Sequence, residues 1–334
     1  MQYDIAVIGN DEAAFEMLCL AARSKRRTLA VLPETHHSAW LVTQALRRLI
    51  TNLLVDRTPQ RRRLFRQAGT PRLLQTLLAR AIVKEVGEHR EMLQTLGVDV
   101  MLGEARFSDS HRLLVSLGIT CTREVVDARY IVIGTGIRRT AMHRPLGLMP
   151  FHRPETLFAG HVLPKSVCIV GGGYFGTGLA ALISLFGVET RHIARADTTS
   201  TMLEMAVAAG VRVGHHPSDV GLQHFNAPFA AEGTNVVDCR RSVGFTDHLS
   251  LDAIHIEPDE NGQLWCASSF ETWCSGIFGI GDVVGFSPDT VLNPSIQAER
   301  ILHRISQTVP RPHLADALAK SASSASRSRA VVTK

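Results

Sequence analysis

Two stretches of the chain alternate short apolar runs with helical patterns, as βαβ units do. The more complete stretch spans residues 167–197. It opens with the apolar run 167–170, continues with apolar residues at helical spacing over 179–186, and ends with a second predicted strand over 188–194. Short apolar runs on either side of an amphipathic helix are typical of parallel strands buried in a sheet. The pattern predicts a Rossmann-type unit at the centre of the chain.

The turn between the first strand and the helix of this unit carries glycines at G-x-G-x-x-G spacing. Gly171 suits a tight turn, Gly173 lets the backbone approach a diphosphate, and Gly176 lets the helix pack closely on the strand. The phosphates would then lie on the free amides at the start of the helix. The sequence therefore predicts a dinucleotide site here. The alternative is a glycine-rich turn of the same fold that binds no ligand.

A second unit of this kind opens the chain, with strands expected over 3–8 and 29–32 and a helix between them. In its turn Gly9 and Ala14 stand where the first and third glycines belong, and an alanine still allows fairly close packing. Asp11 replaces the middle glycine, and it adds a side chain and a negative charge where a diphosphate should approach. The sequence predicts a damaged site.

The remaining pattern predicts further α/β structure. Pro71 suits the first turn of a helix. We expect helices within 35–97 and over 202–209 and 293–305, and strands or extended segments over 98–102, 106–107, 113–117, 124–127, 130–133, 211–214, 235–239 and 265–271. The polar, low-complexity segment from residue 320 onward is expected to be disordered.

Composition narrows the class of protein. The 334 residues carry a net charge of +5, and no basic face with base-reading groups is visible, so no nucleic-acid partner is expected. No apolar run is long enough to span a bilayer and no leader segment is recognisable, so we expect a cytoplasmic protein with no membrane partner. The six cysteines are scattered and the histidines form no ligand motif, so no metal site is expected.

Two later motifs connect the glycine turns to a known family. Gly134-Thr135-Gly136 follows the predicted strand 130–133, and Gly281-Asp282 follows an apolar run near the end. With two Rossmann openings, these motifs resemble the two-dinucleotide-binding-domain flavoproteins, the pyridine nucleotide-disulfide oxidoreductase superfamily. The segments 103–107, 246–249, 261–264 and 281–286 are similar to those of its soluble transhydrogenase branch.

This resemblance implies an architecture. It is an α/β fold of two Rossmann-like, three-layer domains that bind FAD and NAD(P), with one inserted in the other. Residues 1–158 and 246–312 would form the FAD-type domain, residues 159–245 the inserted NAD(P) domain, and residues 313–334 a disordered tail. The resemblance also implies that Thr135, Gly136, Gly281 and Asp282 contribute to the flavin site. A Gly-Asp pair that only caps a helix is the alternative for the last two.

The chain departs from the family pattern in three places. The stretch 35–40, where dithiol members carry a C-x-x-x-x-C pair, has no cysteine, so dithiol chemistry is not expected. Pro33 replaces the acidic residue that would bind the FAD ribose, and Glu34 follows one position late. No segment matches the interface domain of the family, so the oligomeric state stays open.

The choice of nicotinamide nucleotide depends on the end of the strand 188–194. An acidic residue there selects NAD by binding the ribose 2′-hydroxyl, and this chain has Ala194 with Arg191 and Arg195 nearby. Arginines favour a 2′-phosphate, so NADP(H) is preferred. The alternative is that both arginines are solvated surface residues.

Three functions remain open. The first is an FAD-dependent oxidoreductase, in which hydride passes from a nicotinamide nucleotide through flavin to a second nucleotide, NADPH to NAD, as in the transhydrogenases; no catalytic side chain is named, because the cofactors carry the chemistry. The second is a flavin enzyme that uses another acceptor, such as a quinone or an iron–sulfur partner. The third is a degenerate, flavin-free protein that binds NAD(P) or regulates through it.

Overall fold

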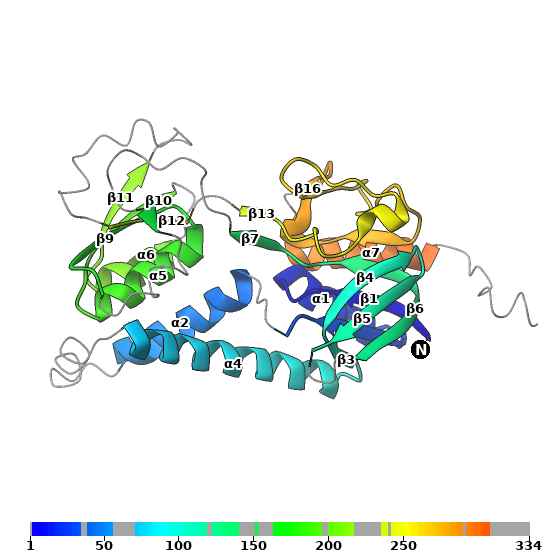
Figure 1. The fold of residues 1–334 in the computed structure, drawn as a ribbon, viewed down its shortest axis with the longest axis horizontal. Helices are drawn as coiled ribbons and strands as arrows, with labels where there is room; N and C mark the ends of the chain where they lie inside the picture. Colours follow the sequence, from blue (N-terminus) through cyan, green and yellow to red (C-terminus); the bar gives the residue numbers. More distant parts are fainter. Residues whose placement is uncertain are drawn as a thin grey trace, which may run out of the picture.

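The computed structural model shows two lobes joined by two crossing strands and by helices (Figure 1). The structure describes residues 2–34, 39–55, 71–118, 122–139, 151–152, 163–195, 200–216, 235–239, 242–289 and 292–307. The predicted tail, 313–334, lies outside the described residues. The α/β class and the two Rossmann-like sheets expected from the sequence are confirmed.

The first lobe is built on a seven-stranded sheet in the order β3-β2-β1-β6-β5-β4, with β15 beside β6. The strands β1, β2, β3, β6 and β15 are parallel, whereas β4 and β5 form an antiparallel extension. The bounds are β1 Gln2–Ile8, β2 Thr28–Leu32, β3 Asp99–Leu102, β4 Glu104–Asp109, β5 Arg112–Leu117, β6 Thr122–Ile133 and β15 Ile277–Gly279.

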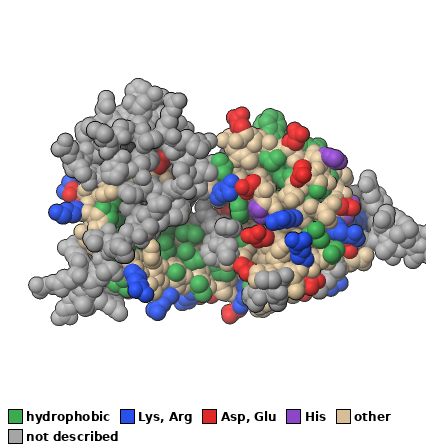
Figure 2. Space-filling model, in the orientation of Figure 1, with side chains coloured by type: hydrophobic (Ala, Val, Ile, Leu, Met, Phe, Trp, Pro, Cys, Tyr) green, Lys and Arg blue, Asp and Glu red, His purple; other side chains and the backbone are tan. Residues whose placement is uncertain are grey.

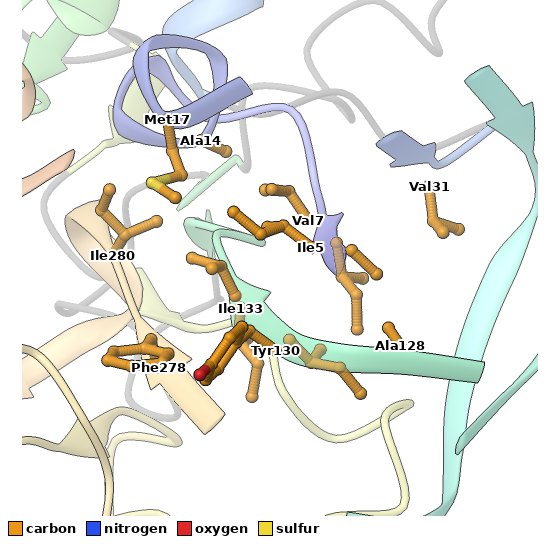
Figure 3. Close-up of a cluster of buried hydrophobic side chains, with 14 of the residues drawn as sticks. Ile5, Val7, Ala14, Met17, Val31, Ala128, Tyr130, Ile133, Phe278 and Ile280 are labelled. Atoms are coloured by element: carbon orange, nitrogen blue, oxygen red, sulfur yellow. The ribbon is translucent and has the colours of Figure 1, made fainter. Parts of the chain in front are cut away.

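The helix α1 (Glu12–Arg23) and the helix α7 (Pro294–Gln307) pack against each other beside this sheet. Figure 3 shows Met17 and Ala14 of α1 directed toward Val7 of β1 and Ile280 after β15. These side chains are almost fully buried, because the parallel strands have neighbours on both faces. The first core therefore fixes the start of α1 over the ends of β1 and β6.

The strand β6 corrects one expectation. The sequence indicated two strands, over 124–127 and 130–133, whereas β6 is continuous for 12 residues. Its first half pairs with β5, and its second half pairs with β15, while β1 lies along its other edge. The pairing partner of β6 changes from β5 to β15 between the two halves, and the strand continues through this change.

The second lobe contains a five-stranded sheet in the order β11-β10-β9-β12-β8, all parallel. The bounds are β8 Phe151–His152, β9 Ser166–Val170, β10 Glu189–Arg195, β11 Arg212–His216 and β12 Asn235–Asp238, with helices α5 Gly173–Leu185 and α6 Ser200–Ala208. Two short strands, β7 (Ile137–Arg139) and β13 (Ser242–Gly244), pair antiparallel between the lobes.

Two helices connect the cores of the lobes. The helix α2 (Ala39–Val55) packs on α4 (Pro71–Thr95) and on α5 of the second lobe. Leu46 and Ile50 of α2 are fully buried in one cluster with Leu179 and Leu182 of α5. The long α4 contributes to both cores, with Leu74 in the second and Leu93 in the first (Figure 1 shows its path along both lobes).

The C-terminal part of the first lobe holds the remaining short elements. They are the 3-10 helices η3 (Leu251–Ile254) and η4 (Gly281–Val283) and the strands β14 (Leu264–Trp265) and β16 (Val284–Phe286), which pair in parallel. The extended segment expected over 265–271 is wrong beyond Trp265, because the chain turns at Phe270, which has a positive φ of 63°. The structure thereby brings η4 next to the start of α1.

The surface of the first lobe carries charges of both signs without a single-sign face in the view of Figure 2. The same view shows hydrophobic side chains gathered over α2, beside residues drawn in grey. Among the described residues, no helix combines the length and the apolar character needed to cross a membrane.

Candidate dinucleotide sites

The central glycine turn lies at the carboxyl end of β9, where α5 begins. The amide of Gly171 donates a hydrogen bond to the Ile193 carbonyl of β10 at 2.9 Å. A side chain at Gly176 would overlap the Gly171 carbonyl oxygen, so the close helix–strand contact expected from the sequence is present. Around Gly173, by contrast, an added Cβ would meet no described atom within 4 Å. The backbone is therefore open at the position where a diphosphate would approach.

A buried histidine of β10 contacts the helix that follows this turn. His192 of β10 is fully buried, and its Nε2 lies 3.0 Å from Thr177 Oγ1 on α5. Thr177 in turn donates to the Gly173 carbonyl oxygen at 2.8 Å. These contacts tie the first turn of α5 to the sheet. This role was not predicted from the sequence, since a lone histidine in a strand carries no motif.

The two arginines predicted to favour NADP(H) both belong to β10. Arg191 Nη2 lies 3.9 Å from Glu189 Oε1, and Arg212 of β11 approaches the same carboxylate at 3.2 Å. Arg191 is level with Cys168, two residues before the part of β10 that faces the glycine turn. The backbone of Arg195 ends β10, and its side chain lies outside the described part of the chain. The roles of both arginines stay predictions.

The first glycine turn has a backbone that suits a diphosphate. Gly9 has a positive φ of 112°, and a side chain there would overlap the Gly134 carbonyl oxygen. Ala14 of α1 packs against Gly134, so the alanine does keep the helix close to the strand end. Gly136 and Gly281, from two other segments, border the same small volume. Three segments of the chain therefore leave room for one group at the start of α1.

The carboxylate of Asp11 lies in that volume. A Cβ added to Gly136 would be 3.3 Å from Asp11 Cγ, and one added to Gly281 would overlap Asp11 Oδ2. The Asp282 amide donates to Asp11 Oδ2 at 3.2 Å, and the side chain of Asp11 is only 5% exposed. Asp11 is the N-cap residue of α1 but makes no capping bond with its side chain. Its carboxylate instead joins η4.

Burial of Asp11, and then the nearby charge of Asp282, raises the pKa of Asp11 to about 7. The backbone hydrogen bonds from Asp282 and Glu12 act in the opposite direction and are smaller. The pKa of Glu12 is also raised, through burial and through the charges of Glu16 and Asp282. This end of α1 therefore carries an excess of acidic groups at the place where a helix start favours an anion.

Other residues of the predicted first site make hydrogen bonds to groups of the protein itself. Glu34 Oε1 accepts from the Gly118 amide at 3.2 Å, so its carboxylate is directed to the end of β5. The Gly281 amide donates to Gln297 Oε1 at 2.9 Å, and Gln297 of α7 is buried. The sequence did not identify Gln297, because a glutamine in an amphipathic helix carries no motif.

Two buried polar atoms beside the turn lack partners among the described residues. They are the hydroxyl Oγ1 of Thr135 and the indole Nε1 of Trp40. Trp40 lines a pocket that also borders Gly9 and Pro33. Its ring lies 5.9 Å from Phe15 and 5.0 Å from His89, measured between ring centroids. Buried polar groups are rarely left unpaired, so these atoms fit a site that takes a ligand.

Comparison with known proteins decides the family. The model of the pyridine nucleotide-disulphide oxidoreductase family matches residues 3–300. The chain belongs to this family. Members of the family use FAD and a nicotinamide nucleotide, and the Rossmann-like sheets of this chain agree with that.

Curated relatives include the soluble pyridine nucleotide transhydrogenases. That of Marinomonas sp. (strain MWYL1) is 23% identical over 317 residues, and that of Pseudomonas syringae pv. syringae (strain B728a) is 24% identical over 320 residues. Each alignment covers 85% of this chain and 67% of the relative. The chain thus spans about two thirds of the length of these enzymes.

Solved structures show the same fold. The HOCl-induced flavoprotein disulfide reductase RclA from Escherichia coli matches with a TM-score of 0.60 and 16% identity, covering 93% of this chain and 72% of that one. LpdA from Mycobacterium tuberculosis matches with a TM-score of 0.61 and 19% identity, covering 94% and 74%. At such identities the likeness concerns the fold alone.

Several features of the first site suit FAD, and one feature does not. The glycines Gly9, Gly136 and Gly281, the close packing of Ala14 and the unpaired Thr135 hydroxyl all suit a dinucleotide. The ionised carboxylate of Asp11 does not, because it is a negative charge that lies between Gly136 and Gly281 and accepts the Asp282 amide there.

Proposed function

We propose that this protein is an NADPH-dependent oxidoreductase of the transhydrogenase type, which passes hydride equivalents from NADPH to NAD. The open space at Gly173 supports this proposal most directly, since it lies at the carboxyl edge of a parallel sheet, where dinucleotides bind. The names of the relatives supply the reaction type.

The nicotinamide nucleotide is proposed to lie on Gly171, Gly173 and Gly176, with its diphosphate at the start of α5. Ala194 at the end of β10 offers no carboxylate against a 2′-phosphate, and Arg191 and Arg195 supply positive charge from the same strand. These features favour NADPH over NADH as the hydride donor.

The flavin is proposed to use the first lobe. Its site would comprise Gly9, Ala14, Glu34, Thr135, Gly136, Gly281 and Asp282. When bound, FAD supplies a carrier that accepts two electrons from one nucleotide and gives them to another acceptor. The chain itself binds and orients the nucleotides, and no acid or base side chain is assigned.

A second candidate is a flavin-free protein that binds NAD(P) and acts in regulation. One observation favours it, namely that the carboxylate of Asp11 accepts the Asp282 amide inside the first site. In this candidate the second lobe keeps its nucleotide, and Asp11 is a structural link between α1 and η4.

An absorption spectrum separates the two candidates. Protein purified as the full chain is expected to show flavin bands near about 370 and 450 nm that bleach on anaerobic addition of NADPH. Re-oxidation by a nicotinamide analogue would then establish transhydrogenation, and re-oxidation by a quinone alone would exclude it. Protein that is colourless and does not take up added FAD, yet still binds NADPH, would contradict the oxidoreductase and support the flavin-free candidate.

A further inference from the structure

The carboxylate of Asp11 occupies the position of a bound anion. It lies at the start of α1, it accepts a backbone amide at 3.2 Å, and glycines border it on two sides. Backbone amides at a helix start and glycines that leave room are the features by which dinucleotide folds bind phosphate. The carboxylate of Asp11 therefore lies, from within the chain, beside the glycines that would leave room for the diphosphate of a ligand.

An ionised Asp11 and a diphosphate exclude each other. Both are anions, and a diphosphate at this turn would have to enter the space beside Gly136 and Gly281 in which the Asp11 carboxylate already lies. The charged groups that face Asp11 add to the repulsion, because they are the carboxylates of Asp282 on η4 and Glu12 on α1. Gln297 of α7, which accepts a hydrogen bond from the amide of the adjacent Gly281, and Thr135, which precedes Gly136, do not titrate.

A protonated Asp11 changes this relation. The neutral carboxyl group no longer repels phosphate, and its O–H can donate a hydrogen bond to a phosphate oxygen. It also accepts the hydrogen bond from the Asp282 amide less strongly, because a neutral acceptor binds an amide less strongly than a charged one. The same side chain thus becomes a donor to the ligand it otherwise excludes.

We propose that Asp11 is the specificity-determining residue of the first site, which accepts a diphosphate only when Asp11 carries a proton. Above the pKa of Asp11, close to one proton is then taken up for each FAD that binds, whereas ligands without phosphate bind independently of Asp11. This inference rests on the proposed function, since it concerns the flavin site of that function. Because the pKa of Asp11 is raised to about 7, Asp11 gains or loses its proton near neutral pH.

Calorimetric titration of the full chain with FAD tests the proposal. Because binding is linked to protonation of one group with a pKa of about 7, FAD should bind about tenfold more tightly near pH 6 than near pH 8. Titrations near pH 8 in two buffers with different ionisation enthalpies should show an uptake close to one proton per FAD.

Two variants and one ligand serve as controls. Asp11→Asn keeps the shape and removes the titration, so its affinity for FAD should be equal at both pH values, at least as tight as that of the wild type near pH 6, and without proton uptake. Asp127→Asn removes the same charge from a surface pair with Arg112 on β5 and should behave as the wild type. Riboflavin, which has no phosphate, should bind with no dependence on this proton.

The outcomes separate this inference from the proposed function. FAD binding by the wild type that is equal at both pH values, with no proton uptake, would overturn the role of Asp11 and leave the flavin function standing. Binding by Asp11→Asn alone would support the exclusion by Asp11 and contradict the flavin function of the native chain. Absence of FAD binding in both proteins would overturn both.

Discussion

The two glycine turns of this protein have similar backbones and different contents. Each follows a strand with parallel neighbours, β1 or β9, and begins a helix that packs closely, through Ala14 in one lobe and Gly176 in the other. The second turn is open at Gly173, whereas the first is filled by the carboxylate of Asp11. A dinucleotide fold can thus be kept while access to its phosphate position is controlled by one side chain.

The largest effect is expected from closing the open turn. Gly173→Asp places a charge and a side chain where the second turn is empty, and should weaken NADPH binding at least about a hundredfold, close to 3 kcal/mol or more. Fluorescence titration with NADPH measures this. Gly97→Asp is a matched control, because Gly97 also has a positive φ and open surroundings but follows α4. Unchanged NADPH affinity in Gly173→Asp would mean that the two turns do not differ in function.

The filled turn should make the stability of the protein depend on pH. The folded state keeps a proton on Asp11 up to a pKa of about 7, whereas the unfolded chain releases it near 3.8, so stability falls as the pH rises between these values. Relative to Asp11→Asn, the wild type should lose roughly 2–3 kcal/mol of unfolding free energy between about pH 5 and about pH 8. Urea unfolding of both proteins measures this, and a difference that stays constant with pH contradicts it.

Two variants of the second turn should distinguish the close packing at Gly176 from the open space at Gly173. Gly176→Ala forces a methyl group into the Gly171 carbonyl and should cost roughly 1–3 kcal/mol of stability. Gly173→Ala meets open space, so only the strain of its positive φ, about 1 kcal/mol, is expected. Thermal unfolding of both variants measures the difference. Equal losses would show that the close contact at Gly176 is not decisive.

The smallest effect concerns the choice between nucleotides. Arg191→Ala should weaken NADPH binding by a few fold, less than about 1 kcal/mol, and leave NADH binding unchanged, because only NADPH carries the 2′-phosphate. Arg212→Ala is the control, since Arg212 shares the partner Glu189 but belongs to β11. Parallel loss of NADPH and NADH affinity in Arg191→Ala would place its role in the strand rather than at the ligand.

Much of the fold follows from the sequence, because buried parallel strands are short apolar runs and most were recognised as such. The division of β6 was wrong, since periodicity records which faces are buried and not where a strand ends. The damage at Asp11 was also visible in the sequence. Its acceptance of the Asp282 amide was not, because the two residues are 271 positions apart. Gln297 lies only 16 positions from Gly281, and it was missed because a glutamine in an amphipathic helix carries no motif.

The packing of α2 and α4 has a consequence for how this fold can be divided. In sequence, the second lobe is an insertion with two ends, and it looks like a cassette that could be cut out at the crossing strands β7 and β13. Its core, however, includes Leu46, Ile50 and Leu74, which belong to helices encoded long before the insertion. A fragment restricted to the inserted segment would leave the apolar side of α5 uncovered. Exchange of this lobe between family members therefore requires that α2 and the first half of α4 be exchanged together with it.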